Sequence, residues 1–272
     1  MEDPCTGILI AIGLRSPDII VEKLLGIEHQ PPRSLLLAAK EICNNDGPKQ
    51  CIDQLWDYIL HLLHMNQVEE DMLAIYEVLR AVVSCVQRQL NVKASAEDEL
   101  PFLKKAAIKS CDTFQLLRDH WPLVHKPKIV QEMLQLLGNL VALMPASSVK
   151  DETDWLIEKL TDLPINMTLY IEECVLQVLD AVLVSKTGGF DKDSQVESTM
   201  FLLFKLLHVS GRGSDRSLIW RSFLALTTLH SDQVVHSLLR YLKSEDLATL
   251  ESALTVFTKV LCNGALPSLA TY

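Results

Sequence analysis

Two histidines one helical turn apart are the pattern in the sequence that most resembles a metal site. His61 and His64 flank two leucines, and Asp57 precedes His61 by four residues. On a helix these side chains would share one edge, where imidazole nitrogens and a carboxylate oxygen can ligate zinc. The glutamate base and the third protein ligand of a metalloprotease helix are missing. We therefore interpret both histidines as the polar edge of a long helix, with a metal-dependent enzyme that uses them as an alternative.

The other candidate catalytic motifs are incomplete. The segment Gly211-Arg212-Gly213-Ser214 could cradle a phosphate at a helix start, but it lacks the Lys-Ser/Thr pair of a P-loop and follows no strand. Ser84 and Ser252 have no His and Asp at a fixed spacing that would activate them. We therefore predict that the chain is not an enzyme and that it binds no cofactor and no metal.

Basic residues gather in two tracts of an otherwise acidic chain. The net charge is −10, but residues 102–130 hold six basic and two acidic side chains, and so do residues 205–243. Residues 150–200, by contrast, hold four lysines and eleven acids. Segregated charge is typical of a protein-binding surface, and the net charge disfavours contact with bulk nucleic acid. The predicted partner-binding residues are Lys104, Lys105, Lys109, Arg118, Lys126, Lys128, Asn139, Arg216, Arg221 and Arg240.

Composition favours a helical protein of a reducing compartment. Hydrophobic residues make up 49% of the chain but aromatic residues only 6%, so Leu, Val, Ile and Ala carry the apolar content. The seven cysteines are odd in number, scattered, and form no Cys-x-x-Cys pair, which favours the cytoplasm or the nucleus. The apolar run Ile8 to Ile12 lacks the basic flank of a secretory signal, and no run of about 18 uncharged apolar residues would span a membrane.

Apolar residues repeat with the period of a helix from end to end. In the clearest case Asn66 and Glu69 form a capping box before a long apolar stripe. The stripe consists of Val68, Met72, Ile75, Tyr76, Leu79, Val82, Val83 and Val86. Breakers such as Asn44-Asn45-Asp46-Gly47 and Pro164 separate about 12 helices, and no strand is predicted. The helices are expected near 17–25, 32–43, 49–65, 66–90, 100–119, 127–144, 150–162, 166–185, 194–210, 216–229, 232–243 and 246–262.

Two kinds of helix alternate along the chain. Some carry a single apolar stripe, whereas residues 133–144 are apolar nearly all round, and such a helix must be covered on both flanks. Stacked antiparallel helical hairpins supply that cover. We predict one all-α solenoid domain over 1–272. Two alternatives stay open: a fragment or isoform of a longer solenoid, and a subdivision near 91–99.

The segment Leu136-Leu137-Gly138-Asn139-Leu140-Val141-Ala142-Leu143 resembles the third helix of an armadillo repeat. Equivalent leucine-rich cores at Leu79, Leu137, Leu179, Leu226 and Phe257 are spaced by 58, 42, 47 and 31 residues, and armadillo or HEAT units span about 40–47. The resemblance implies a right-handed superhelical stack of hairpins. It also implies that Asn139 would face an extended peptide. In style the degenerate Leu-rich repeats are similar to those of the meiosis inhibitor family.

The missing catalytic motifs and the segregated charge together predict an interaction scaffold. We expect it to hold a helix or an extended segment of a partner protein. A chromosome-associated scaffold for meiotic recombination or DNA repair, with weak nucleic-acid contact through the basic tracts, is the alternative. Gly7 to Leu14 and Leu254 to Leu269 are apolar, so self-association through the ends is a further expectation.

Overall fold

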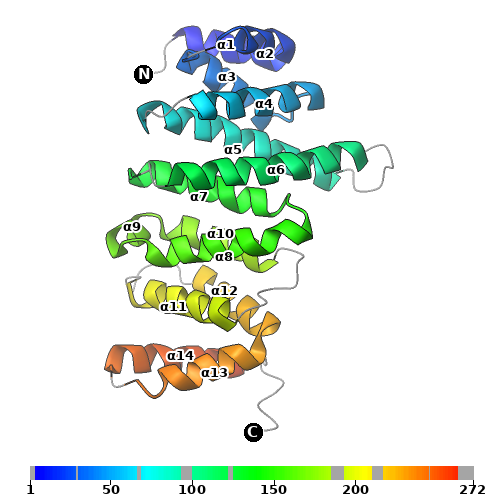
Figure 1. Cartoon of the computed structure of the whole chain (residues 1–272). Coiled ribbons are helices and arrows are strands. Elements are labelled where there is room, and N and C mark those ends of the chain that lie inside the picture. The colour runs from blue at the N-terminus through cyan, green and yellow to red at the C-terminus, as the bar shows by residue number, and fades with distance from the viewer. Residues whose placement is uncertain are drawn as a thin grey trace. The chain divides into compact units, whose positions relative to one another are not determined.

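The computed structural model describes residues 4–28, 30–65, 69–92, 100–121, 125–184, 193–209, 217–244 and 246–262. Over these residues the protein is all-helical, as the sequence predicted, and the described part contains 14 helices and no strand (Figure 1). The chain divides into two compact units, unit 1 (Met1–Met144) and unit 2 (Pro145–Tyr272). Most of the subdivision predicted near 91–99 lies outside the described residues.

Two helices that the sequence did not predict account for the difference from about 12. The apolar N-terminal segment forms α1 (Pro4–Arg15). The helix expected over 166–185 is divided into α9 (Ile165–Tyr170) and α10 (Glu172–Val184). Ile171 separates them because its backbone, at φ −116° and ψ 24°, leaves the helical region. A one-residue break of this kind leaves the apolar period intact and is invisible in the pattern.

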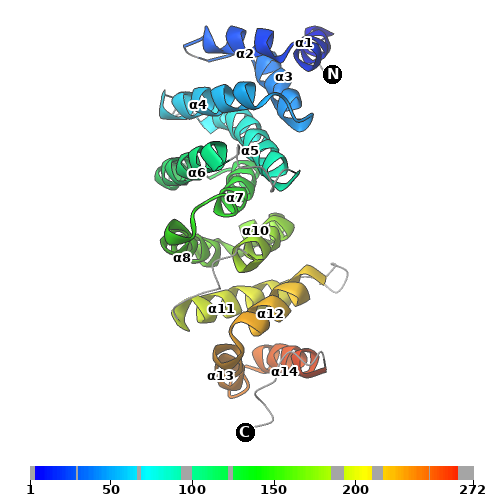
Figure 2. The same ribbon diagram turned by 90° about the vertical axis from the view of Figure 1, so that its right-hand side faces the viewer.

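The described part of unit 1 contains seven helices arranged in two rows. They are α1, α2 (Pro17–Leu25), α3 (Arg33–Asn44), α4 (Lys49–Met65), α5 (Glu69–Val92), α6 (Leu100–His120) and α7 (Pro127–Val141). Helices α1, α3, α5 and α7 lie side by side in close backbone contact and form the tight row. Helices α2, α4 and α6 form the second row, and Figures 1 and 2 show the two rows back to back. Each hairpin therefore covers the next.

The apolar stripe of α5 fills the space between the rows. Its described members lie at 0–1% exposure, as the period of 3.6 residues predicts; they are Met72, Ile75, Tyr76, Leu79, Val82, Val83 and Val86. The predicted capping residue Asn66 and the first predicted stripe residue, Val68, lie outside the described residues. Helix α7 buries side chains around most of its circumference because α5 covers one flank and α6 another. Inside unit 1, a helix that the sequence showed to be apolar on more than one side is thus contacted by two neighbouring helices.

The turn after α3 shows why the Asn44-Asn45-Asp46-Gly47 segment stops a helix. Asp46 adopts a positive φ of 53°, which Asp tolerates better than most residues. The amide of Gly47 donates to the carbonyl of Ile42, and a Cβ at Gly47 would lie 2.5 Å from Ile42 Cγ2. Only glycine fits so close to the helix that it terminates.

A lysine from α6 lies between two aspartates of α4 and ties the second row together. Lys109 Nζ lies 2.6 Å from Asp57 Oδ1 and also bonds the Asp53 carboxylate, which Lys105 shares. Burial raises the pKa of Asp53, but the hydrogen bonds from Lys105 and Lys109 outweigh burial, so that pKa lies below its ordinary value. Nearby, Trp56 Nε1 donates to Thr113 Oγ1 over 2.9 Å. Polar contacts and ring packing thus join α4 to α6.

Unit 2 repeats the two-row arrangement. Its helices are α8 (Ala146–Asp162), α9, α10, α11 (Asp193–Val209), α12 (Ser217–Leu229), α13 (Ser231–Tyr241) and α14 (Leu247–Cys262). Helix α11 contacts α8 and α13, and α12 contacts α10 and α14. An aromatic cluster joins three helices, with the Phe204 ring 5.5 Å from Phe223 and 4.5 Å from Tyr241. Lys259 of α14 lies 4.0 Å above the Trp220 ring.

Most of the described cysteines are buried free thiols. Cys43, Cys51 and Cys85 are at most 1% exposed, and Cys51 Sγ donates to Asp18 over 2.9 Å. Burial raises the pKa of Cys51 to about 12 and that of Cys85 to about 11. A thiol held protonated is a poor nucleophile and a poor metal ligand, so these three residues act as small core side chains.

Removing the shared lysine of the α4–α6 contact should destabilise unit 1. We expect Lys109→Met to lower the free energy of unfolding by about 2 kcal/mol, because two aspartates lose their common partner. The matched control Lys104→Met, at an exposed position on the same helix, should change it by less than about 0.5 kcal/mol. Urea denaturation followed by circular dichroism measures both. Because the pKa of Asp53 is lowered, the difference should persist above pH 4 and fade as the pH drops below that pKa. Equal midpoints for the two variants at pH 7 would contradict this account.

Thiol labelling should separate the exposed cysteine from the core ones. At pH 8 we expect a maleimide to modify Cys5 rapidly and to leave Cys43, Cys51 and Cys85 unmodified until the chain unfolds, as followed by peptide mass spectrometry. Because burial raises the pKa values of Cys51 and Cys85, the stability gained by keeping these two thiols protonated is complete below about pH 9 and is lost as the pH rises towards 11–12. Fast labelling of Cys85 in the folded protein would refute the assignment.

Candidate partner-binding face

The outer surface of α3, α5 and α7 carries a row of half-buried polar side chains. Positions 77, 80, 84 and 87 of α5 recur every three or four residues and therefore share one face of that helix. From this face Glu77 accepts a hydrogen bond of 2.9 Å from Lys40 of α3. Arg80 donates over 2.7 Å to Glu132 of α7. We call this surface the α3/α5/α7 face.

Asn139 occupies the same face and is fixed by two contacts to α5. Its side-chain Nδ2 donates to Ser84 Oγ over 3.1 Å, and its backbone carbonyl accepts from Gln87 Nε2 over 2.6 Å. The face therefore holds two ion pairs and two amide hydrogen bonds, each linking neighbouring helices of the tight row. Side chains fixed in this way lose little conformational entropy when a partner binds.

The sequence alone located only one residue of this face. Asn139 was predicted from its resemblance to an armadillo helix, whereas Lys40, Glu77, Arg80 and Glu132 were not predicted. Their signal lies in the helical period of α5, where polar residues opposite the apolar stripe recur at a spacing that matches one exposed edge. The α3 and α7 side chains that contact these α5 residues are determined by how the helices stack. The helical period of the sequence does not reveal the stacking.

The first predicted basic tract is only partly available to a partner. Lys105 and Lys109 are held by Asp53 and Asp57, as described above. Lys104 and Lys128 are exposed and form no ion pair with the residues that the structure describes. Lys126 is exposed at the N-terminal boundary of α7, and Arg118 lies in the last turn of α6. Two of the six cations are thus engaged by carboxylates within unit 1.

The second tract is engaged within unit 2. Arg221 donates to Asp180 over 2.9 Å, and Arg240 lies 2.9 Å from Glu197. Lys205 donates to the carbonyls of Thr161 and Leu163 at the end of α8, and burial lowers its pKa. Arg216 lies outside the described residues. The acidic stretch and the basic stretch that follows it therefore meet in space.

The histidine pair of α4 is exposed, and its neighbours do not complete a metal site. Asp57, which would have been the carboxylate ligand, is bonded to Lys109. Within the described ranges no group of three His, Cys, Asp or Glu side chains is placed to hold a metal ion. His120 is buried instead, with Nδ1 3.4 Å from Tyr76 Oη, and burial followed by the charge of His64 lowers its pKa.

No helix in the described part of the chain is both long enough and apolar enough to cross a bilayer. Every helix in that part of the chain is too short or too polar to qualify. The sequence-based expectation of no membrane span is consistent with this finding.

Comparison with known proteins identifies a fold and no family. No protein-family model matches the chain, and no curated protein matches it. Among solved structures, the crystal structure of an engineered protein is similar, with 16% sequence identity and a TM-score of 0.51. The match covers 91% of this chain and 98% of the engineered one. At this identity the likeness concerns the helical architecture alone.

Proposed function

We propose that the chain is a non-catalytic interaction scaffold whose α3/α5/α7 face binds a helix or an extended segment of a partner protein. The observation that carries the proposal is the row of cross-helix polar contacts on that face, from Lys40–Glu77 through Arg80–Glu132 to Ser84–Asn139. The row alternates cationic, anionic and amide groups on rigid elements. A partner segment with complementary groups could bond to them with little reorganisation.

The packing of unit 1 supports a concave surface at this place. Helices α1, α3, α5 and α7 approach one another through their backbones, whereas α4 and α6 meet through longer side chains such as Lys109 and Trp56. A stack whose rows differ in spacing bends towards the tighter row. The right-handed superhelical arrangement and the armadillo or HEAT subtype belong to this proposal, with Asn139 as the contact to a peptide backbone.

Nucleic-acid contact is the alternative, and Lys104 and Lys128 would carry it because both are exposed. Four other cations of the predicted tracts, Lys105, Lys109, Arg221 and Arg240, are paired with carboxylates, which reduces the positive field available to phosphates. A chromosome-associated scaffold would therefore contact DNA through few residues. The test is the electrophoretic mobility of duplex DNA in the presence of the chain. A salt-sensitive mobility shift that disappears in the Lys104→Glu, Lys128→Glu double variant would favour this alternative over the scaffold that binds protein segments.

The scaffold proposal can be tested with peptides selected from a display library on the intact chain. We expect Gln135→Arg, which places a long cation on α7 between Glu132 and Asn139, to weaken the selected peptides about tenfold or more. Asn139→Ala should weaken them less, because it removes one amide contact. Isothermal titration measures each affinity.

The matched control is Gln115→Arg, the same exchange at an exposed position of α6 in the second row. It should leave the affinities and the unfolding midpoint unchanged. The proposal is wrong if no saturable peptide is recovered, or if Gln135→Arg and Gln115→Arg bind every selected peptide as tightly as the original chain.

A further inference from the structure

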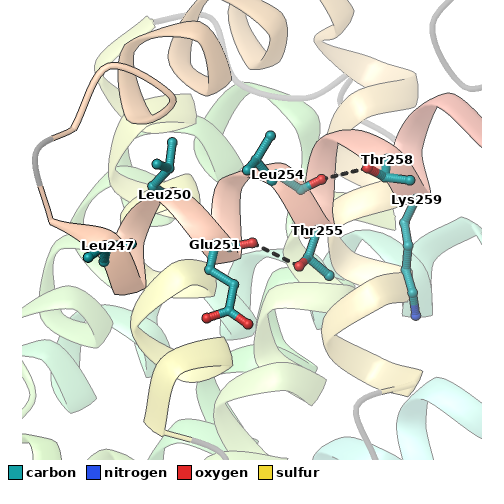
Figure 3. A pocket seen from close by; sticks show the side chains of 7 residues that line it. All are labelled: Leu247, Leu250, Glu251, Leu254, Thr255, Thr258 and Lys259. Carbon is teal, nitrogen blue, oxygen red and sulfur yellow. Dashed lines mark hydrogen bonds between the residues drawn. The ribbon is translucent and has the colours of Figure 1, made fainter.

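Helix α14 presents an apolar groove on the side away from its neighbours. The groove has a volume of about 610 Å³, and Figure 3 shows its lining side chains along this one helix. Leu247 is 80% exposed and Leu254 is 50% exposed, although both are large apolar side chains. Ala253 and Val256, on the opposite side of the helix, are fully buried. The two charges in the groove are Glu251 and Lys259.

Helix α1 has a matching outer face. Arg15 is its only charged residue, so the helix is apolar nearly all round. Among the described residues, α2 and α3 pack against one side of it. Thr6 and Gly13 are buried there, and the outward Ile8 and Ile12 are 62% and 37% exposed. A helix that is apolar on every side is normally covered on every side.

The fold itself shows what covers such faces. In unit 1 α3 lies between α1 and α5, and in unit 2 α12 lies between α10 and α14. Within each row, the apolar face of one helix is therefore covered by another helix of this chain. The outer faces of α1 and α14 are the positions where a row could accept one more helix.

We propose that two copies of the chain associate head to tail, with the outer face of α1 in one copy packed on the α14 groove of the next. An antiparallel register brings together the groups that match. Residues 8, 12 and 15 of α1 are spaced by four and three, and residues 258, 254 and 251 of α14 have the same spacing in reverse. Ile12 then faces Leu254, Ile8 faces Thr258, and Arg15 meets Glu251. The inference is independent of the proposed function, because neither helix belongs to the α3/α5/α7 face.

The contact is heterologous, because two different surfaces meet, and this property makes it testable by mixing. One helix face on each side buries less than the roughly 1,200 Å² of a standard stable interface, so association should be weak and concentration-dependent. Light scattering coupled to size exclusion, up to about 0.5 mM chain, would detect a dissociation constant of about 0.1 mM.

The experiment uses the intact chain with Ile8→Glu or Leu254→Glu. Each variant alone should be monomeric, since each lacks one of the two surfaces. Their equimolar mixture should form a dimer that grows no further, because one copy retains the α14 groove and the other retains the α1 face. The matched control is Ile108→Glu on α6, at a side chain 64% exposed, and it should associate like the original chain.

Exchanging the charges of the Arg15–Glu251 pair tests the register. It also separates a lost contact from a folding defect, because the double exchange should restore association. Arg15→Glu alone and Glu251→Arg alone should each weaken association about tenfold, and the double exchange in one chain should restore it. Circular dichroism confirms that each variant folds. A chain that is monomeric at 0.5 mM would overturn the proposal. So would association that survives Ile8→Glu or Leu254→Glu alone, a mixture that stays monomeric, or an unrestored double exchange.

Discussion

The structure depends on helices that carry more apolar surface than one neighbour can cover. In unit 1 the described members of the α5 stripe are buried completely, and α7 buries side chains around most of its circumference. Covering such helices on both flanks requires further helices beside them, which the two-row arrangement supplies. The gain from burial, about 25 cal/mol per Å² of apolar surface, accumulates from hairpin to hairpin and needs no central core. Helices at the outer positions of a row, such as α1 and α14, then retain apolar faces.

The same stacking explains how charge is distributed along the chain. Asp180 and Glu197 lie in the acidic stretch, and their partners Arg221 and Arg240 lie in the basic stretch that follows. Asp53 is bonded to Lys105 and Lys109 in the same way. Sequence separations of about 40 to 56 residues correspond to the step from one hairpin to the next. Part of the charge segregation that suggested a binding surface thus consists of ion pairs between neighbouring hairpins. The polar contacts of the α3/α5/α7 face extend this pattern to the tight row.

The sequence predicted the helical class, most helix boundaries and the buried stripe, because these follow from local periodicity, caps and breakers. Helix α3 ends at Asn44 because Gly47 lies close to Ile42. The breaker Asn44-Asn45-Asp46-Gly47 predicted this end from the sequence. The break at Ile171 was missed because it leaves the apolar period unchanged. Of the candidate face, Asn139 was predicted, whereas Lys40 and Glu132 were not, because their roles depend on which helices become neighbours. For the same reason the sequence could not show that Asp57 forms an ion pair with Lys109. That pair occupies the carboxylate that a metal site with His61 and His64 would need.

The most direct test of the stacked arrangement is native-state hydrogen exchange at a chain concentration where the protein is monomeric. Stacked hairpins that contact only their neighbours should open in separate steps. We predict the highest opening free energies for α3 and α5 in unit 1, which each lie between two neighbours of the tight row, and lower values for α1 and for α14. Protection should change hairpin by hairpin as denaturant is added. One common opening free energy for all amides from α1 to α14 would show a single cooperative core and would contradict the account.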